Sequence, residues 1–394
     1  MMNRNNPMWP ALGGCLAMAA AMGIGRFVYT PILPVMIAAL DWSKLDAGLA
    51  ASANFLGYML GALVVGRPIF AARPRHWLLA ALAVSTATTA GMAATTQLYP
   101  LMAMRFAAGV ASAFVIICAS TLVLERLAAA GRGRLAAVHF AGVGAGIVAS
   151  AVIVAALAGA GAGWQAMWLV SGLAALVASL IAARLIPSGS TSVVAEQPQQ
   201  SSNDDTALAG IALAHGLFGF GYVITATFLV TIVRETESIR LLEPWIWVLV
   251  GIATIPSVPL WQWLGSRIGL LRAYAVACLV EAVAVTASVE WESVTGVCIS
   301  AVLLGGTFMG LTALGITGAR VLSGGRVQRA IGLTTASFGF GQMVGPTVAG
   351  VLSQQSGSLR SASLAAAAAL VLAALLAYGT SMVEQRGKIT AKSG

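Results

Sequence analysis

The hydrophobic positions of this chain fall into long runs that are separated by charged residues, prolines and short polar clusters. Each run has about 20 residues or more, the length that an α-helix needs to cross the hydrocarbon core of a bilayer. None of the runs alternates with the period of two that a membrane-spanning strand would show. The pattern therefore predicts an all-α integral membrane protein with twelve transmembrane helices, at residues 11–33, 45–66, 77–96, 98–124, 135–160, 164–186, 207–233, 244–265, 272–289, 293–319, 328–353 and 360–383.

One polar stretch interrupts the middle of the chain. Residues 187–206 are rich in Ser, Gln and Pro and have no apolar periodicity, which is typical of a linker. The stretch separates six predicted helices in residues 1–186 from six in residues 207–394. Glycines repeat between the two sets at a nearly constant offset of 196 to 199 residues: Gly23 and Gly25 match Gly219 and Gly221, Gly109 matches Gly305, and Gly142 and Gly146 match Gly341 and Gly345. We therefore expect two similar six-helix bundles related by a pseudo-twofold repeat and joined by a cytoplasmic linker.

Composition agrees with a membrane protein and excludes a soluble one. Of the 394 residues, 59% are hydrophobic and only 9% are charged, whereas a soluble domain has about 25% charged residues. A net charge of +9 would suggest nucleic-acid binding in a soluble protein. Placing the N-terminus in the cytoplasm instead puts 16 of the 22 Lys and Arg residues on the cytoplasmic side and only 4 outside. This bias follows the positive-inside rule, so we predict a multi-pass protein of a bacterial-type inner membrane, with both termini cytoplasmic and no nucleic-acid partner.

Three charged residues lie well inside the predicted spans, away from the span ends: Arg26, Arg105 and Glu281. A charge at this depth costs about 2.5–3.5 kcal/mol on insertion scales, so it must face a cavity or a partner. Arg26 can bind a carboxylate or phosphate through both arms of its guanidinium group, or it can be a structural arginine bonded to backbone carbonyls. Arg105 can take part in substrate or proton coupling, or it can lock neighbouring helices together. Glu281 can relay protons, or it can be a protonated structural residue.

Further polar residues could complete a pocket around Arg26, or they could each bond to a neighbouring helix. The substrate-binding candidates are Arg26, Tyr29, Thr30, Asn54, Tyr58, Tyr222, Thr225, Thr307, Ser337 and Gln342. His139 and His215 can titrate in the physiological range, so they are coupling candidates together with Arg105 and Glu281, and packing is their alternative role. Neither metal-ligand spacing nor a nucleotide-binding motif is present, so we expect no metal, no cofactor and no enzymatic activity.

Several motifs resemble those of the major facilitator superfamily (MFS). Residues 101–109 place Arg105 in an R-x-x-x-G pattern, and residues 341–346 read G-x-x-x-G-P. Residues 66–75 are a degraded form of the superfamily loop G-x-x-x-D-R-x-G-R-R, and its Asp is absent both there and in the counterpart at 265–269. Three arginines of these loops are further gating candidates: Arg67, Arg73 and Arg267.

Within the superfamily, two segments are similar to the YbfB/YjiJ family. Residues 23–34, Gly-Ile-Gly-Arg-Phe-Val-Tyr-Thr-Pro-Ile-Leu-Pro, resemble the family signature, and residues 215–228 resemble its seventh helix. The resemblance implies a secondary transporter that moves a small organic molecule by alternating access. Arg26 favours an organic anion as the substrate and a proton is a candidate coupling ion. We expect a monomer, whose partners are this small molecule and the lipid bilayer. Two alternatives stay open: an exporter of lipophilic or cationic drugs, and a non-transporting membrane receptor with the same fold.

Overall fold

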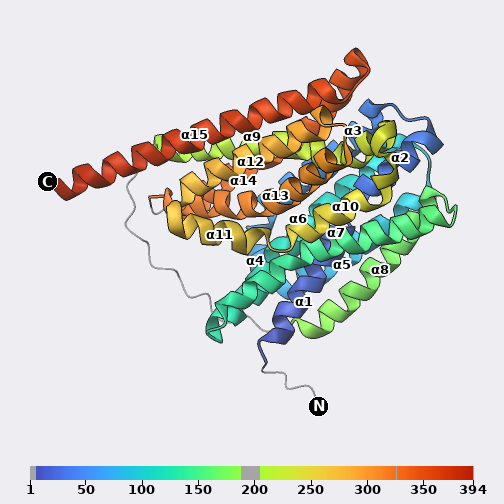
Figure 1. Cartoon of the computed structure of the whole chain (residues 1–394). Coiled ribbons are helices and arrows are strands. Elements are labelled where there is room, and N and C mark those ends of the chain that lie inside the picture. Colours follow the sequence, from blue (N-terminus) through green and yellow to red (C-terminus); the bar gives the residue numbers. More distant parts are fainter. Residues whose placement is uncertain (1–5, 188–204, 325, 394) are drawn as a thin grey trace.

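The computed structural model describes residues 6–187, 205–324 and 326–393, and these residues form helices and turns without any strand (Figure 1). Residues 188–204, most of the predicted linker, lie outside the described part. The α-helices are α1 (Met8–Met18), α2 (Tyr29–Leu40), α3 (Lys44–Val65), α4 (Pro68–Ala71), α5 (Pro74–Gly91), α6 (Leu98–Ala129), α7 (Ala136–Gly159), α8 (Trp164–Leu185), α9 (Asp205–Glu235), α10 (Glu243–Thr254), α11 (Ser257–Ile268), α12 (Leu270–Glu290), α13 (Val294–Val321), α14 (Val327–Ser356) and α15 (Arg360–Ser393).

The predicted all-helical fold class is confirmed, and ten helical segments of the described chain are long and apolar enough to cross a membrane. The segments Glu237–Thr254 and Ser257–Ile268, which are bent by 44° at Pro256, make an eleventh if they are taken together. Helix α14 has 30 residues but is not among these spans, because its glycines and its Ser, Thr and Gln side chains lower its hydropathy. The count of twelve therefore depends both on the bent pair forming one span and on α14, which is long enough to span but unusually polar.

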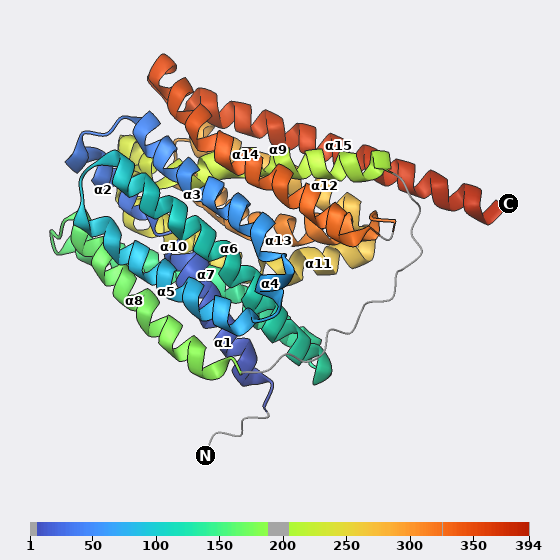
Figure 2. The same cartoon turned by 180° about the vertical axis from the view of Figure 1, so that it is seen from behind.

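Elements from the two parts of the sequence lie on opposite sides of the molecule. In Figures 1 and 2, α5, α6 and α8 gather on one side, and α9, α12 and α15 gather on the other. The two sides meet where α3 packs against α14 and where α7 packs against α10. The first span and α9 are the most buried spans, with 83% of the apolar window of each inside the protein, so these two line the centre.

The glycines that repeat in the sequence occupy equivalent helix crossings. A Cβ atom on Gly109 of α6 would overlap the carbonyl oxygen of Asn54 in α3, and a Cβ on Gly305 of α13 would overlap that of Val250 in α10. The crossings of α7 with α1 and of α14 with α9 behave in the same way: Gly142 lies against the Cys15 carbonyl, and Gly341 lies against the Gly216 carbonyl. Only glycine permits such a close approach of two helix backbones.

The first span is broken halfway. Helix α1 leads into a π-helical segment, Ala19–Ile24, in which the backbone widens to i→i+5 hydrogen bonds, for example from the Gly25 N–H to the Ala20 carbonyl at 2.9 Å. An irregular turn follows at residues 25–28, before α2 begins at Tyr29. The Thr30 N–H bonds to the Phe27 carbonyl at 3.3 Å rather than to the carbonyl of Arg26. The break therefore frees backbone carbonyls in the middle of the molecule, at the position of Arg26.

Contacts between the two sides close the molecule at the end where α3 begins and α14 ends. The Lys44 ammonium pairs with the Glu235 carboxylate at 2.8 Å, and the hydroxyls of Ser52 and Thr347 lie 2.8 Å apart. The Thr30 hydroxyl donates to the Ala226 carbonyl of α9 at 2.7 Å. These contacts join the first span and α3 to α9 and α14, so the site described next is covered from this end.

Candidate functional site

Arg26 projects from the broken turn into the centre of the protein, where it is 3% exposed. Its Nη2 donates a hydrogen bond to Oε1 of Gln342 in α14 at 3.2 Å. The guanidinium carbon lies 4.2 Å from the ring centroid of Tyr58 and 4.6 Å from that of Phe55, both in α3. The side chain therefore touches elements from both sides of the molecule.

The charge of Arg26 has no acidic partner in the described part of the chain. The ion pairs there include Lys44–Glu235, Arg234–Glu243 and Arg360–Glu290, and Arg26 takes part in none of them. The Nε of Arg26 is buried and has no hydrogen-bond partner. Aromatic rings and a neutral amide only partly replace the hydration of a buried cation. The arrangement leaves a guanidinium group with unused donors and an uncompensated charge, which is the chemistry that binds a carboxylate or phosphate.

A layer of aromatic rings adjoins this cation. The Gln342 amide that accepts from Arg26 also donates, through Nε2, to the Tyr222 hydroxyl in α9. The Tyr222 ring is nearly parallel to the rings of Phe308 and Phe338, with interplanar angles of 6° and 5°. Phe308 in turn meets Phe27, the neighbour of Arg26, edge to face at 5.7 Å. The surroundings of the cation are thus apolar and aromatic, with few polar groups.

Arg105 has a different environment from that of Arg26. Its Nη1 and Nη2 donate to the carbonyl of Arg26 at 3.4 and 3.3 Å, and Nη1 also donates to the carbonyl of Gly25 at 3.4 Å. Its guanidinium carbon lies 4.5 Å from the centroid of the Tyr29 ring. These are the carbonyls that the broken helix leaves free. Of the two roles that the sequence left open, this geometry favours a helix-locking arginine that holds the turn carrying Arg26.

Glu281 and Thr307 form a second polar centre between α12 and α13. Glu281 is fully buried, and its Oε2 is in hydrogen-bond contact with the Thr307 hydroxyl. Thr307 is therefore placed next to Glu281 rather than in contact with Arg26.

Each of the two predicted histidines has a hydroxyl partner. His215 Nδ1 lies 3.0 Å from the Tyr274 hydroxyl, and the His215 ring stacks on Phe338. His139 Nε2 lies 3.0 Å from the Ser120 hydroxyl. No group of three or more His, Cys, Asp or Glu side chains that could hold a metal occurs in the described ranges.

Several predicted substrate-binding residues contact helices instead of Arg26. The Tyr29 hydroxyl donates to the Ala47 carbonyl, and the Asn54 amide donates to the Arg105 carbonyl, both at 2.8 Å. Ser337 is half-buried against Gly216. Thr225 is fully buried and its hydroxyl has no partner. Of the ten candidates, the structure brings Arg26, Tyr58, Tyr222 and Gln342 together.

The gating candidates of the two loops lie far from these contacts. Arg67 and Arg73 flank the short helix α4 and are exposed, and Arg267 is exposed near the end of α11. The Arg267 guanidinium carbon lies 5.8 Å from the Trp263 ring centroid.

Sequence reasoning missed the aromatic partners of the site and the neighbours of its buried acid. Phe27 and Phe55 could have been found from their spacing, because Phe27 adjoins Arg26 and Phe55 lies one helical turn before Tyr58. Tyr274 precedes Cys278 by four residues on α12, and Cys278 precedes Glu281 by three. The three side chains therefore share one face of that helix, a spacing that the sequence already shows. No local signal indicates Phe308, which reaches the site through the packing of α13.

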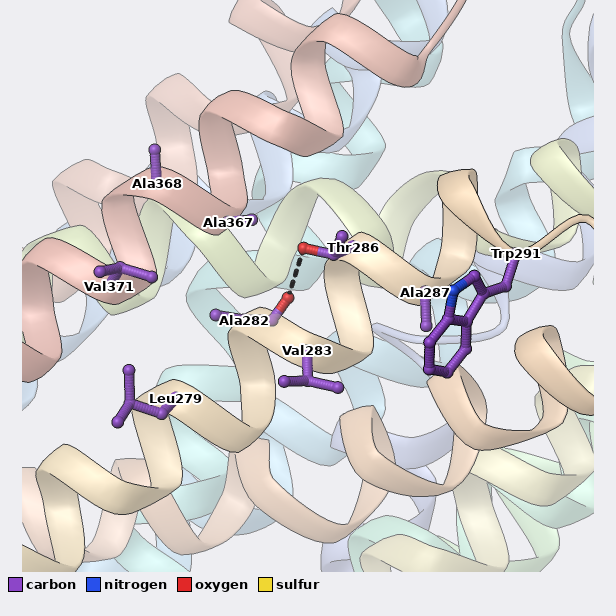
Figure 3. A pocket seen from close by; sticks show the side chains of 9 residues that line it. All are labelled: Leu279, Ala282, Val283, Thr286, Ala287, Trp291, Ala367, Ala368 and Val371. Carbon is purple, nitrogen blue, oxygen red and sulfur yellow. Dashed lines mark hydrogen bonds between the residues drawn. The ribbon is translucent and has the colours of Figure 1, made fainter.

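A groove of about 470 Å³ lies elsewhere, on the outer face between α12 and α15 (Figure 3). Its polar lining residue Thr286 donates its hydroxyl to the Ala282 carbonyl of its own helix at 2.9 Å, as the dashed line in Figure 3 shows. The lining residues are Leu279, Ala282, Val283, Thr286, Ala287, Trp291, Ala367, Ala368 and Val371. Without a charged group this groove does not suit an anion, and its apolar lining is suited to contact with lipid.

Comparisons with known proteins agree with the fold. The profile of a family described as "Uncharacterised MFS-type transporter YbfB" matches residues 18–378. No curated protein matches the chain. Among solved structures, a variant of the nucleoside transporter NupG superposes with a TM-score of 0.71 at 13% identity, covering 95% of this chain and 99% of that one. NupG itself gives 0.68 at 15% identity, covering 96% and 99%. A bacterial homolog of the human lysosomal transporter Spinster, inward-facing and unoccupied, gives 0.63 at 13% identity, covering 98% of each chain.

Proposed function

Because the chain belongs to the family of YbfB-type MFS transporters, we propose that it moves a small organic anion across the membrane by alternating access, with Arg26 as the anion-binding residue. The observation that carries this proposal is the unpaired charge of Arg26. A buried guanidinium without an acidic partner is costly, and an anionic substrate would supply the missing partner. No step requires enzymatic chemistry on the substrate.

Arg26 lies at the interface between the two sides of the molecule, so a substrate bound to it would affect the contacts between them. Its contacts include Tyr58 of α3 and Gln342 of α14, which belong to the proposed bundles of residues 1–186 and 207–394. A substrate anion that replaces the Gln342 oxygen as the partner of Arg26 would change the contact between the bundles. Such a change at the bundle interface is what alternating access requires.

The rings around Arg26 support an anion with an apolar or aromatic body. Phe55 and Tyr58 lie against the guanidinium, and Tyr222 and Phe308 stack on each other nearby. A carboxylate would bind the guanidinium, and the remainder of the molecule would pack on the rings. A cationic drug is disfavoured, because it would be repelled by Arg26 in a region of low dielectric constant.

The proposed architecture has twelve spans in two bundles, with α14 as the eleventh span. The recurring glycine crossings, Gly109 with Gly305 and Gly142 with Gly341, support two equivalent six-helix repeats. A polar α14 suits this architecture, because its Gln342 reaches the centre rather than lipid. We place the monomer in a bacterial-type inner membrane with both termini in the cytoplasm. The closed end with Lys44 and Glu235 then faces outward, and rocking of the bundles would open it.

Thermal-shift measurements on purified protein test the anion site. A panel of aromatic and aliphatic carboxylates is expected to contain compounds that raise the Tm of the wild type, because ligands that bind the folded state stabilise it. Arg26→Ala should weaken that binding by about 2 kcal/mol or more, roughly 30-fold, since it removes one partner of a buried charge pair. Arg26→Lys should recover part of the carboxylate binding, because lysine keeps the positive charge but lacks the paired N–H donors of the guanidinium group.

The matched control is Arg240→Ala, because Arg240 is exposed and lies in the connection between α9 and α10. It should leave the stabilisation by the same carboxylate unchanged. Equal stabilisation of the wild type and Arg26→Ala would remove Arg26 from the site. Stabilisation by organic cations instead of carboxylates would favour the drug-exporter alternative.

A further inference from the structure

Glu281 is a buried carboxyl group that the anion site does not use. It lies in the middle of α12 and is fully buried. Its Oε2 contacts the Thr307 hydroxyl, and its Oε1 has no hydrogen-bond partner. None of the ion pairs within the described ranges includes it. The group therefore lacks the cation that would normally accompany a buried carboxylate.

The hydrogen bonds of Thr307 indicate where a proton must lie. A threonine hydroxyl has one proton to donate. The Thr307 oxygen lies 2.6 Å from the carbonyl oxygen of Leu303, which can only accept, in addition to its contact with Glu281. If the hydroxyl proton goes to Leu303, the contact with Glu281 needs a second proton, and the carboxyl group is the partner that can carry it. A neutral carboxylic acid also avoids leaving an unpaired charge in an apolar interior.

No cation among the residues that the structure describes forms an ion pair with Glu281. The titratable neighbours that interact with it are Cys278 on its own helix and Tyr222 of α9. Helix α13 contributes the hydroxyl of Thr307. Helix α15, which also packs against α12, contributes Arg360, and that residue pairs with Glu290 at the far end of α12. The exposed Arg267 is the cation of α11.

A row of side chains that can exchange protons connects Glu281 to His215. Cys278 lies one helical turn before Glu281, and Tyr274 lies one turn before Cys278, so the three buried side chains share one face of α12. The Tyr274 hydroxyl lies 3.0 Å from His215 Nδ1 in α9. Each member can accept one proton on one side and release another on the other side. A proton that enters at His215 can therefore reach Glu281 while the intermediate groups end unchanged.

We propose that Glu281 is a proton-binding site, separate from the anion site at Arg26, and that its proton exchanges through Cys278, Tyr274 and His215. Tyr222 connects the two sites, since it interacts electrostatically with both Arg26 and Glu281 and accepts a hydrogen bond from Gln342. That the proton travels with the substrate anion rests on the proposed function. The protonation of Glu281 itself does not, so the two can fail separately.

Infrared spectroscopy of the protein in lipid, without any substrate, tests the site. The wild type at neutral pH should show the carbonyl stretch of a neutral, buried carboxylic acid. Glu281→Gln should lack this band, because glutamine mimics the neutral acid in shape and hydrogen bonding. Glu290→Gln, at the exposed end of the same helix, should retain it. Thr307→Val should shift the band, because it removes the hydroxyl partner without replacing Glu281, and this variant tests the assignment even if Glu281→Gln fails to fold.

The route is tested by transferring the protein into D₂O and following the downshift of the band. Tyr274→Phe removes the hydroxyl between His215 and Cys278, so the exchange of the Glu281 proton should become slower than in the wild type. Equal exchange rates would remove the route. A wild-type spectrum that is identical to that of Glu281→Gln would mean that Glu281 is ionised, and it would overturn the proposed site without bearing on anion binding at Arg26.

Discussion

Replacing Arg105 with alanine is expected to lower the free energy of unfolding by about 3 kcal/mol and to abolish carboxylate binding at Arg26. Arg105 donates to the carbonyls of Gly25 and Arg26, which the break in the helix leaves without a backbone N–H donor. Hydrogen bonds to a charged group contribute about 1.5–3 kcal/mol each, and a buried acceptor left unsatisfied adds a further penalty. The turn that presents Arg26 would then lose its support.

The stability change is measured by denaturant unfolding in detergent, and the binding change by the carboxylate-dependent rise in Tm. Arg105→Lys is the matched comparison variant. Lysine keeps the positive charge but lacks the planar guanidinium group, whose paired N–H donors reach two carbonyls at once. This variant should fall between the wild type and Arg105→Ala in stability. An Arg105→Ala protein that is as stable as the wild type and still binds carboxylates would refute the supporting role of this residue.

Replacing Gly142 with alanine is expected to destabilise the protein by about 3 kcal/mol, the upper end of the roughly 1–3 kcal/mol that overpacking typically costs. A Cβ atom at Gly142 would overlap the carbonyl group of Cys15, which belongs to the backbone of α1 and cannot rotate away. The helices α1 and α7 would have to separate. The break that carries Arg26 follows directly after α1, so the variant should also perturb the anion site.

Gly159 provides the matched control for this substitution. It lies at the end of the same helix, and a Cβ atom there would meet nothing within 4 Å. Gly159→Ala should be neutral or stabilising by up to about 1 kcal/mol, because alanine has the higher helix propensity. The Tm values of both variants in the same detergent separate the two effects. Equal Tm values for Gly142→Ala and Gly159→Ala would contradict the close crossing.

Much of the fold can be predicted from the sequence. Each membrane span must form its backbone hydrogen bonds within its own helix, and the side chains that face lipid must be apolar. The positions of the helices, the matched glycines and the three intramembrane charges could be read from single segments. The break in the first span was signalled only indirectly, by Gly25 and Pro31. Its consequence, a set of free carbonyls, depends on how the turn hydrogen-bonds in three dimensions.

The candidate site was less predictable, because it depends on helix rotation and on contacts between distant segments. Arg26 and Gln342 are 316 residues apart, and Arg105 reaches a carbonyl 79 residues away. The sequence grouped both Asn54 and Tyr58 with Arg26, but Asn54 donates to the Arg105 carbonyl and Tyr58 contacts Arg26. Depth is given by position along a helix, whereas the partner of a side chain is set by packing.

Uptake into proteoliposomes tests whether this protein carries an organic anion bound at Arg26. The probe is the carboxylate that gives the largest rise in wild-type Tm, added in radiolabelled form outside vesicles that contain the same compound inside. We expect exchange of label by the wild type and by Arg240→Ala, and none above empty vesicles by Arg26→Ala. Exchange by Arg26→Ala at the wild-type rate would contradict this expectation, as would a wild type that binds the carboxylate and moves none.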